Sequence, residues 1–164
     1  ADLIVREAGG GDRHAIIEEH HRRRRELIAL ESPLPGVVER IDEARSLGLR
    51  LAVVSSSDRT WVTTHLAGVG LQDRFEVLFC GYEGLPSKPD PALYQAALNH
   101  FGLKPDRAFA LEDSPNGIKA AKAAGLKCVA VPNVLTAKLD LSHADTLSPS
   151  LCETSVQSLM EALA

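Results

Sequence analysis

The sequence predicts an α/β fold in which a parallel sheet is covered by helices on both faces. Short segments that are largely apolar recur along the chain, and helical segments of about a dozen residues separate them. A glycine follows most of the helical segments, as is common where a helix ends. Strands that are apolar throughout and alternate with helices are typical of a parallel sheet buried on both sides.

Each element is predicted from its own pattern of residues. The apolar segments predict five strands, the last of them short: residues 49–55, 75–80, 107–111, 127–132 and 144–147. The segments between and around them predict six helices: residues 13–31, 37–47, 59–69, 91–101, 115–124 and 153–163. Asp12 follows a run of glycines and is a typical cap for the first helix.

A break in the pattern divides the chain after the first helix. The sequence SPLPGV, residues 32–37, holds two prolines and a glycine and is a candidate hinge. We therefore expect one part over residues 1–31 and a second over residues 32–164. The length of 164 residues and the 45% hydrophobic content suit one sizeable core. Because only 4% of residues are aromatic, that core should consist of Leu, Val, Ile and Ala.

The overall charge argues against two classes of partner. The chain has a net charge of −4 and a pI of about 5.9, whereas proteins that bind nucleic acid or anionic membranes usually present a strongly basic surface. The one basic run, residues 22–25, lies among Glu18, Glu19 and Glu26, so we interpret it as a solvated helix face. No apolar run reaches the length of a membrane span, and no signal-peptide pattern opens the sequence.

The cysteines indicate a reducing compartment. Cys80, Cys128 and Cys152 are odd in number and far apart, without the paired spacing of a zinc site. They fit reduced thiols better than disulfides, which predicts a cytoplasmic protein.

Polar residues follow three of the predicted elements where a parallel sheet binds ligands, beyond the carboxyl ends of its strands. Ser55 and Ser56 come where a strand passes directly into a helix, whose first backbone N–H groups can hold an anion such as phosphate. Alternatively, Ser57 or Asp58 only caps that helix. Both roles are compatible, since one residue can cap while Ser55 faces a ligand.

Lys88 stands in the sequence SKPDP, which follows the strand 75–80. Pro89 and Pro91 restrict the backbone on either side of Asp90, so the lysine extends from a stiff support. Its charge could stabilise a phosphoryl group during transfer. The alternative is a solvent-exposed lysine in a loop.

Glu112 and Asp113 directly follow the predicted strand 107–111, within the sequence LEDSPNG. Mg²⁺ prefers oxygen ligands and keeps several waters, so one or two carboxylates suffice to bind it. Asp113 could bind the metal directly, with Glu112 binding it or holding one of its waters. Alternatively, Asp113 or Ser114 is the cap of a helix whose first residue is Pro115.

Together these motifs resemble the haloacid dehalogenase superfamily, in particular its phosphatases and mutases similar to β-phosphoglucomutase. The segments LAVVSSSDRTWV, SKPDPALY and FALEDSPNGIKAAKAAGLKCVAVPN look like the second, third and fourth motifs of that family, in order. The resemblance implies a Rossmann-like core over residues 32–164. It also implies that residues 1–31 are the last helix of a helical cap domain.

The resemblance also implies a role for each site residue. Ser55 would bind the phosphoryl group and Lys88 would stabilise its charge, which makes them the catalytic residues of this chain. Ser56 and Ser57 resemble positions that touch the phosphate or the substrate. Glu112 and Asp113 would serve a Mg²⁺ cofactor.

One motif of the family is absent from this sequence. Its Asp-x-Asp-Gly-Thr motif, which supplies the aspartate nucleophile and the general acid/base, has no counterpart in these 164 residues. The strand that carries the motif lies in the middle of the family's sheet. We therefore expect a gap flanked by unpaired strands, and a chain that is inactive by itself.

The predicted parent protein is a monomeric Mg²⁺-dependent phosphohydrolase of small phosphomonoesters, such as sugar phosphates. It would act through a phospho-aspartate formed on an aspartate upstream of this chain. One alternative is a phosphosugar mutase of the β-phosphoglucomutase type. The other, for a complete short chain, is a non-catalytic phosphate-binding or regulatory module. The cap selects the substrate in this family, so the resemblance implies no more of the partner than that it is a small phosphorylated metabolite.

Overall fold

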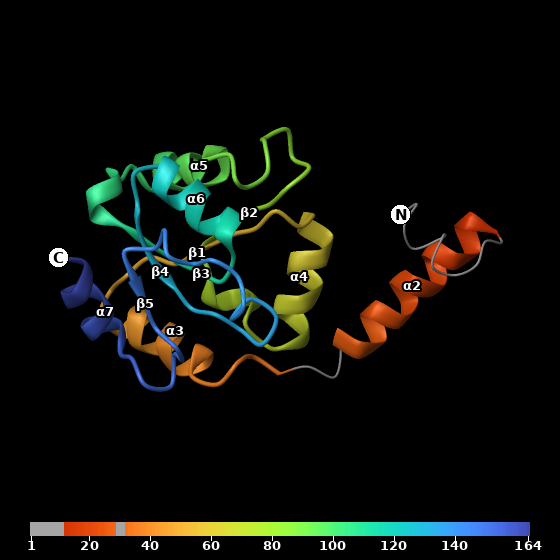
Figure 1. Cartoon of the computed structure of the whole chain (residues 1–164), viewed down its shortest axis with the longest axis horizontal. Coiled ribbons are helices and arrows are strands. Elements are labelled where there is room, and N and C mark those ends of the chain that lie inside the picture. The colour runs from red at the N-terminus through yellow and green to blue at the C-terminus, as the bar shows by residue number, and fades with distance from the viewer. Residues whose placement is uncertain (1–11, 29–31) are drawn as a thin grey trace. The chain divides into compact units, whose positions relative to one another are not determined.

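The computed structural model describes residues 12–28 and 32–164, and the chain divides into two compact units, residues 1–32 and 33–164 (Figure 1). The first unit contains helix α2 (Arg13–Ile28), which Asp12 caps as predicted: the backbone N–H of His14 donates to its Oδ1 at 3.0 Å. Residues 29–31 of the predicted helix lie outside the described residues. The assignment of this part to a cap domain stays a prediction.

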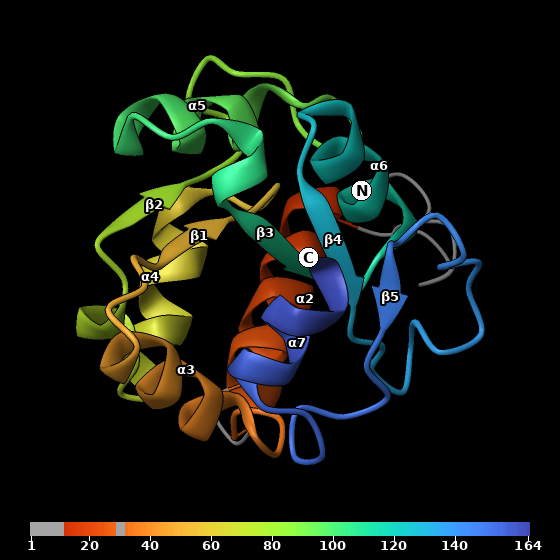
Figure 2. The ribbon, with the colours of Figure 1, turned by 90° about the vertical axis from the view of Figure 1, so that its left-hand side faces the viewer.

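The second unit contains five parallel strands in two separate sheets. The strands are β1 (Ala52–Val54), β2 (Val77–Phe79), β3 (Phe109–Glu112), β4 (Lys127–Ala130) and β5 (Thr146–Leu147). One sheet pairs β1 with β2, and the other has the order β3-β4-β5. Figure 2 shows the two sheets side by side. Within the described residues no strand pairs with the other edge of β1 or of β3, so the expected gap is present.

Helices cover both faces of these strands, as the sequence predicts. They are α3 (Val37–Ser46), α4 (Arg59–Gly68), α5 (Ala92–Phe101), α6 (Pro115–Ala123) and α7 (Val156–Leu163), with short 3₁₀ turns η1 (Gln72–Arg74) and η2 (Pro105–Arg107). In Figure 2, α5 and α6 lie above the strands, and α3 and α7 lie below. Gly102 and Gly125 end α5 and α6 with φ of +63° and +83°, which few residues other than glycine adopt without strain.

Several predicted boundaries differ from the observed ones; β1, for example, begins at Ala52 rather than at residue 49. Two of the differences have clear local reasons. Arg107, predicted to begin a strand, lies in η2, because Pro105 starts a turn there and Arg107 N–H donates to the Lys104 carbonyl at 3.0 Å. The last helix begins at Val156 rather than at residue 153. Ser155 is its cap, since its hydroxyl oxygen accepts from the N–H of Ser158 at 3.0 Å.

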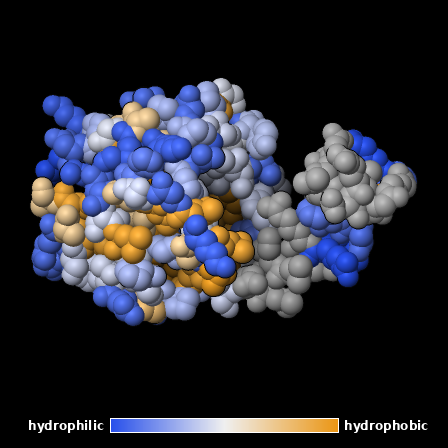
Figure 3. Space-filling view, in the orientation of Figure 1, coloured by the Kyte–Doolittle hydropathy of each residue, from blue (hydrophilic) through white to orange (hydrophobic). Residues whose placement is uncertain are grey.

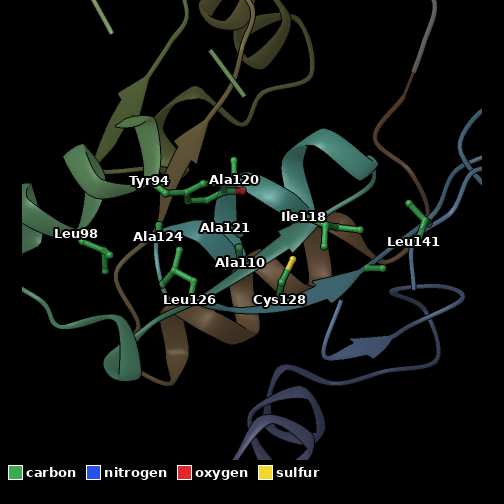
Figure 4. Close-up of a cluster of buried hydrophobic side chains, with 11 residues drawn as sticks. Tyr94, Leu98, Ala110, Ile118, Ala120, Ala121, Ala124, Leu126, Cys128 and Leu141 are labelled. Carbon is green, nitrogen blue, oxygen red and sulfur yellow. The ribbon is translucent and has the colours of Figure 1, made fainter. Parts of the chain in front are cut away.

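The core is made of small and aliphatic side chains, as the scarcity of aromatic residues predicts. Figure 4 shows α6 against β3 and β4, with Ile118, Ala120 and Cys128 completely buried. Leu98 of α5 joins the same cluster. The surface over α5 and α6 is mainly hydrophilic in Figure 3, and apolar side chains gather below it. In the part of the chain that the structure describes, no helix is both long enough and apolar enough to span a membrane.

Asp145, just before β5, fixes the edge of the larger sheet. It accepts from Lys122 Nζ at 2.6 Å and from the Cys128 N–H at 2.8 Å. Partial burial raises the pKa of its carboxyl, but these two hydrogen bonds outweigh burial and hold the pKa below its usual range. A carboxyl whose pKa is lower in the folded chain stabilises the fold above the unfolded-state pKa, about 3.9, and loses that effect as the pH falls further.

The Asp145→Asn variant is therefore expected to be less stable at pH 7, by about 1 kcal/mol, because it loses the charged hydrogen bond from Lys122. The difference should shrink towards pH 3, where the aspartate of the unaltered chain becomes protonated. Urea unfolding at both pH values measures it. A difference that stays constant between pH 7 and pH 3 would contradict this account.

Candidate functional site

Three serines follow β1 at the start of α4. Asp58, not Ser57, is the cap of that helix, since its Oδ1 accepts from the Trp61 N–H at 2.9 Å. The hydroxyl oxygen of Ser55 accepts from the Ser57 N–H at 3.1 Å, which closes a tight turn. Capping therefore does not use Ser55, whose hydroxyl hydrogen can still be donated to a ligand.

A glycine holds the loop after β2 against this turn. The N–H of Gly81 donates to the carbonyl of Ser57 at 2.9 Å. A Cβ at position 81 would lie 2.2 Å from the carbonyl oxygen of Ser56, so only glycine fits without moving the backbone. The loops that follow β1 and β2 are thus locked together, which positions Ser56 next to the segment that carries Lys88.

Lys88 lies between the two sheets rather than in solvent. Its backbone N–H donates to the hydroxyl oxygen of Ser56 at 3.2 Å, and its Nζ donates to the carbonyl of Val54 at 2.8 Å. The ammonium also forms an ion pair with Oε1 of Glu112, and the lysine side chain is only 11% exposed. The alternative of a solvent-exposed lysine is wrong.

Glu112, the last residue of β3, is buried, with a side chain 6% exposed. Its Oε1 also accepts from the hydroxyl of Tyr94 on α5. The centroid of the Tyr94 ring lies 4.9 Å from Nζ of Lys88. Burial, and then the charge of Glu112, raises the pKa of the Tyr94 hydroxyl, so this group stays a donor. Oε2 faces Gly117, where a Cβ would lie only 1.8 Å away. Glu112 therefore holds Lys88 and Tyr94 in place, and its role towards a metal stays a prediction.

Asp113 is exposed at the carboxyl end of β3. Its Oδ2 accepts from Nδ2 of Asn133 at 2.8 Å, and the Asn133 side chain is fixed in turn by the Leu135 N–H, 2.8 Å from its Oδ1. Ser114, not Asp113, caps α6: its hydroxyl oxygen accepts from the Gly117 N–H at 3.1 Å, and Pro115 is the first helical residue. The helix start therefore leaves the Asp113 carboxylate available to a ligand.

Most of the predicted site residues line one cavity of about 430 Å³. It contains five of the six: Ser55, Ser56, Lys88, Glu112 and Asp113. Ser57 is not among the lining residues; its backbone serves the turn instead. The structure therefore brings together a hydroxyl pair, one ammonium group and one exposed carboxylate at the ends of β1 and β3.

The residues present fit part of a magnesium site. Asp113 offers an exposed carboxylate oxygen, the ligand type that Mg²⁺ prefers. No group of three or more His, Cys, Asp or Glu that could hold a metal occurs in residues 12–28 and 32–164. Asp113 would therefore bind the ion together with water or with ligands other than such a group.

The buried cysteines do not offer a substitute nucleophile. Burial, followed by the nearby charge of Glu112, raises the pKa of the Cys128 thiol to about 12. Burial also raises the pKa of Cys80. The thiolate is the reactive form of cysteine, so neither side chain is suited to attack a substrate at neutral pH.

Sequence reasoning missed two residues of the site. Asn133 comes shortly after β4, so the rule that ligands bind beyond the ends of parallel strands could have selected it. Tyr94 lies in the first turn of α5, directly after the SKPDP sequence. An aromatic residue at that place is more often part of the core, and only the structure shows that its hydroxyl reaches Glu112.

Known proteins share both the sequence and the fold. Residues 3–131 match the family described as Haloacid dehalogenase-like hydrolase. YhcW of Bacillus subtilis (strain 168), which carries a provisional phosphatase name, is 41% identical over 133 residues, 81% of this chain and 60% of its own length. The chain thus spans about three fifths of the length of YhcW and of the protein CbbY of Rhodobacter capsulatus.

Several solved structures of other proteins have a fold similar to that of this chain. CbbY from Rhodobacter sphaeroides in complex with phosphate has a TM-score of 0.77 and 32% identity, covering 88% of this chain and 68% of that one. A mutant of the same protein in complex with xylulose-(1,5)bisphosphate gives the same TM-score, with 33% identity. A β-phosphoglucomutase from Clostridium difficile, at 20% identity, shares the fold, with a TM-score of 0.76 over 91% of this chain and 66% of that one. Sequence and structure agree that this chain belongs to the haloacid dehalogenase-like hydrolase family.

Proposed function

We propose that the whole protein containing this chain is a Mg²⁺-dependent phosphatase of small phosphorylated metabolites, sugar phosphates among them. The observation that carries the proposal is the position of Lys88. Its ammonium is fixed by Val54 and Glu112 in one cavity with the Ser55 hydroxyl and Asp113. Two similarities support it: the chain belongs to a hydrolase family, and CbbY has been crystallised with phosphate and with a sugar bisphosphate.

The residues of this chain would hold the phosphoryl group while it is transferred. Lys88 has three N–H donors, two of which are used by Val54 and Glu112. The third has only a 3.5 Å contact with the Tyr94 hydroxyl, so it can turn to a phosphoryl oxygen. The Ser55 hydroxyl would donate to a second oxygen. Asp113 would bind Mg²⁺, which when bound offsets the negative charge of the phosphoryl oxygens.

The nucleophile would be an aspartate outside these residues. Its carboxylate oxygen forms a bond to phosphorus while the ester P–O bond breaks, and the leaving oxygen takes up a proton. Water then attacks phosphorus, breaks the phospho-aspartate bond and releases inorganic phosphate and the free aspartate. Because this chain has no Asp-x-Asp motif, the 164-residue chain by itself is expected to be inactive. Its separated free cysteines support a cytoplasmic location for the whole protein.

The test uses the full-length protein with a panel of sugar phosphates and a generic phosphomonoester, measured by phosphate release. Removal of Mg²⁺ should abolish turnover, and its return should restore it. The Asp113→Ala variant should lose at least about 100-fold in kcat/KM, as other groups that stabilise developing charge do. Asp73→Ala is the matched control, since Asp73 is an exposed aspartate that does not line the cavity.

Three results would count against the proposal. They are turnover that survives metal removal, an Asp113→Ala variant as active as Asp73→Ala, and an isomeric sugar phosphate as product with no release of inorganic phosphate. The last result would favour a mutase.

A further inference from the structure

The loop after β4 passes beside the end of β3, where Asp113 stands. The two strands are neighbours in the larger sheet, as Figure 2 shows, and the N–H of Val131 still donates to the carbonyl of Glu112 at 2.7 Å. Pro132, whose ring fixes its φ, then leads to Asn133 over a short and stiff connection. The Nδ2 group of Asn133 therefore reaches Oδ2 of Asp113, at 2.8 Å, from a well-defined direction.

The Asn133 side chain is itself fixed by the turn that follows it. Its Oδ1 accepts from the N–H groups of Leu135 and Thr136, at 2.8 and 3.1 Å. The N–H of Asn133 donates in return to Oγ1 of Thr136 at 3.0 Å, and its carbonyl accepts from the N–H of Ala137 at 2.9 Å. Since two N–H groups donate to Oδ1, the end of the amide that meets Asp113 is the NH₂ group, which can only donate.

Hydrogen bonds rather than apolar packing hold this turn. Val134 and Leu135 are 91% and 83% exposed, so burial of their side chains contributes little. The hydrogen bonds around Asn133 are the contacts that shape the turn. An amide that is already fixed loses little further freedom when it bonds to a carboxylate. Its contact with Asp113 therefore has a low entropic cost, although the carboxylate is exposed.

This contact gives the two oxygens of the Asp113 carboxylate different surroundings. Asn133 donates to Oδ2, whereas none of the groups in the described segments of the chain bonds to Oδ1. Asp113 lines the cavity of about 430 Å³ and Asn133 does not, so Oδ2 is engaged from the side of the loop and Oδ1 is left to a ligand. Mg²⁺ requires a near-ideal octahedral geometry, which one fixed oxygen satisfies better than a carboxylate that turns freely.

We propose that Asn133 is a positioning residue of the magnesium site, which holds Oδ2 of Asp113 so that Oδ1 is directed at the ion. The inference rests on the proposed function, in which Asp113 is a ligand of Mg²⁺. Asn133 acts only through Asp113. Removal of a residue that orients a metal ligand typically lowers metal affinity by about 10- to 100-fold.

The test measures binding of Mn²⁺ to the full-length protein without substrate, by the loss of the electron paramagnetic resonance signal of the free ion. Mn²⁺ prefers the same oxygen ligands as Mg²⁺ and reports binding without turnover. The diagnostic variant is Asn133→Ser. The serine hydroxyl can accept from the N–H groups of the turn, as the amide oxygen does, but it is too short to reach Asp113. Mn²⁺ affinity should fall about tenfold or more, with the midpoint of urea unfolding unchanged.

Thr136→Ala is the matched control. It removes the hydroxyl that accepts from the Asn133 N–H and so weakens the same turn, but it leaves the amide in contact with Asp113. Mn²⁺ affinity should therefore stay that of the unaltered protein. An equal loss of affinity in Thr136→Ala and Asn133→Ser would overturn the proposal, since Asn133 would then act through the turn alone.

A double-variant cycle separates this inference from the proposed function. Asp113→Ala alone should weaken Mn²⁺ binding, and Asn133→Ser should add nothing to that loss, because the amide acts through Asp113. If Asp113→Ala leaves Mn²⁺ affinity unchanged, the metal role of Asp113 is wrong and the inference is wrong with it. If Asp113→Ala weakens binding and Asn133→Ser does not, the positioning role alone is overturned. Additive losses in the double variant would overturn it as well.

Discussion

The Glu112→Ala variant of the chain is expected to lose about 3–5 kcal/mol of unfolding free energy, because it leaves the ammonium of Lys88 without its partner in a buried place. The two side chains are only 11% and 6% exposed, so water cannot replace the lost carboxylate easily. Tyr94 also loses the acceptor for its buried hydroxyl. Urea unfolding at pH 7, followed by circular dichroism, measures the change.

The matched control is Glu83→Ala. Glu83 forms a similarly close ion pair, with Arg59, but both side chains are well exposed, so its removal should have little effect. Equal loss of stability in the two variants would contradict the view that burial gives the Lys88–Glu112 pair its importance. A Lys88→Met/Glu112→Gln double variant should recover much of the loss, since it removes both charges together.

In the full-length protein, Lys88→Met is expected to reduce kcat/KM by about 100- to 1,000-fold, the cost of removing one group that stabilises developing charge. The fixed ammonium lies where the hydroxyl of Ser55 and the carboxylate of Asp113 also reach the cavity. Steady-state kinetics with the best substrate of the panel measures the effect.

Stability and catalysis must be separated for this variant, because methionine leaves Glu112 unpaired. The Lys88→Met/Glu112→Gln variant separates the two effects, because it should fold well and remain as inactive as Lys88→Met. Lys122→Met, which removes a lysine paired with Asp145 away from the cavity, should keep its activity. A double variant that regains activity would show that Lys88 acts only through the stability of the fold.

The fold was predictable because each element carries its own signal. Apolar segments marked the strands, and Gly102 and Gly125 marked helix ends with a backbone conformation that favours glycine. The errors lie where a local turn outweighs the apolar pattern, as at Arg107 after Pro105. The gap in the sheet was expected only from the family resemblance, since no single segment of the sequence reveals an unpaired edge.

The sequence predicted which residues form the site better than it predicted the contacts between their side chains. The rule that ligands bind beyond the ends of parallel strands selected Ser55 and Asp113. It did not show that Glu112 turns inwards to Lys88 and Tyr94, because the direction of a side chain at a strand end depends on packing between distant elements. Ser57 stands next to Ser56 in sequence, yet only Ser56 reaches the cavity, since the turn uses the backbone of Ser57.

Gly81 has a consequence for protein engineering. Because a side chain at this position would press on the carbonyl of Ser56, the loop after β2 and the turn after β1 cannot be exchanged independently. A chimera that imports the loop of residues 82–87 from a relative should keep the glycine in front of it. In mutational scans, position 81 will score like a binding residue although its effect reaches the cavity only through the backbone of its neighbour.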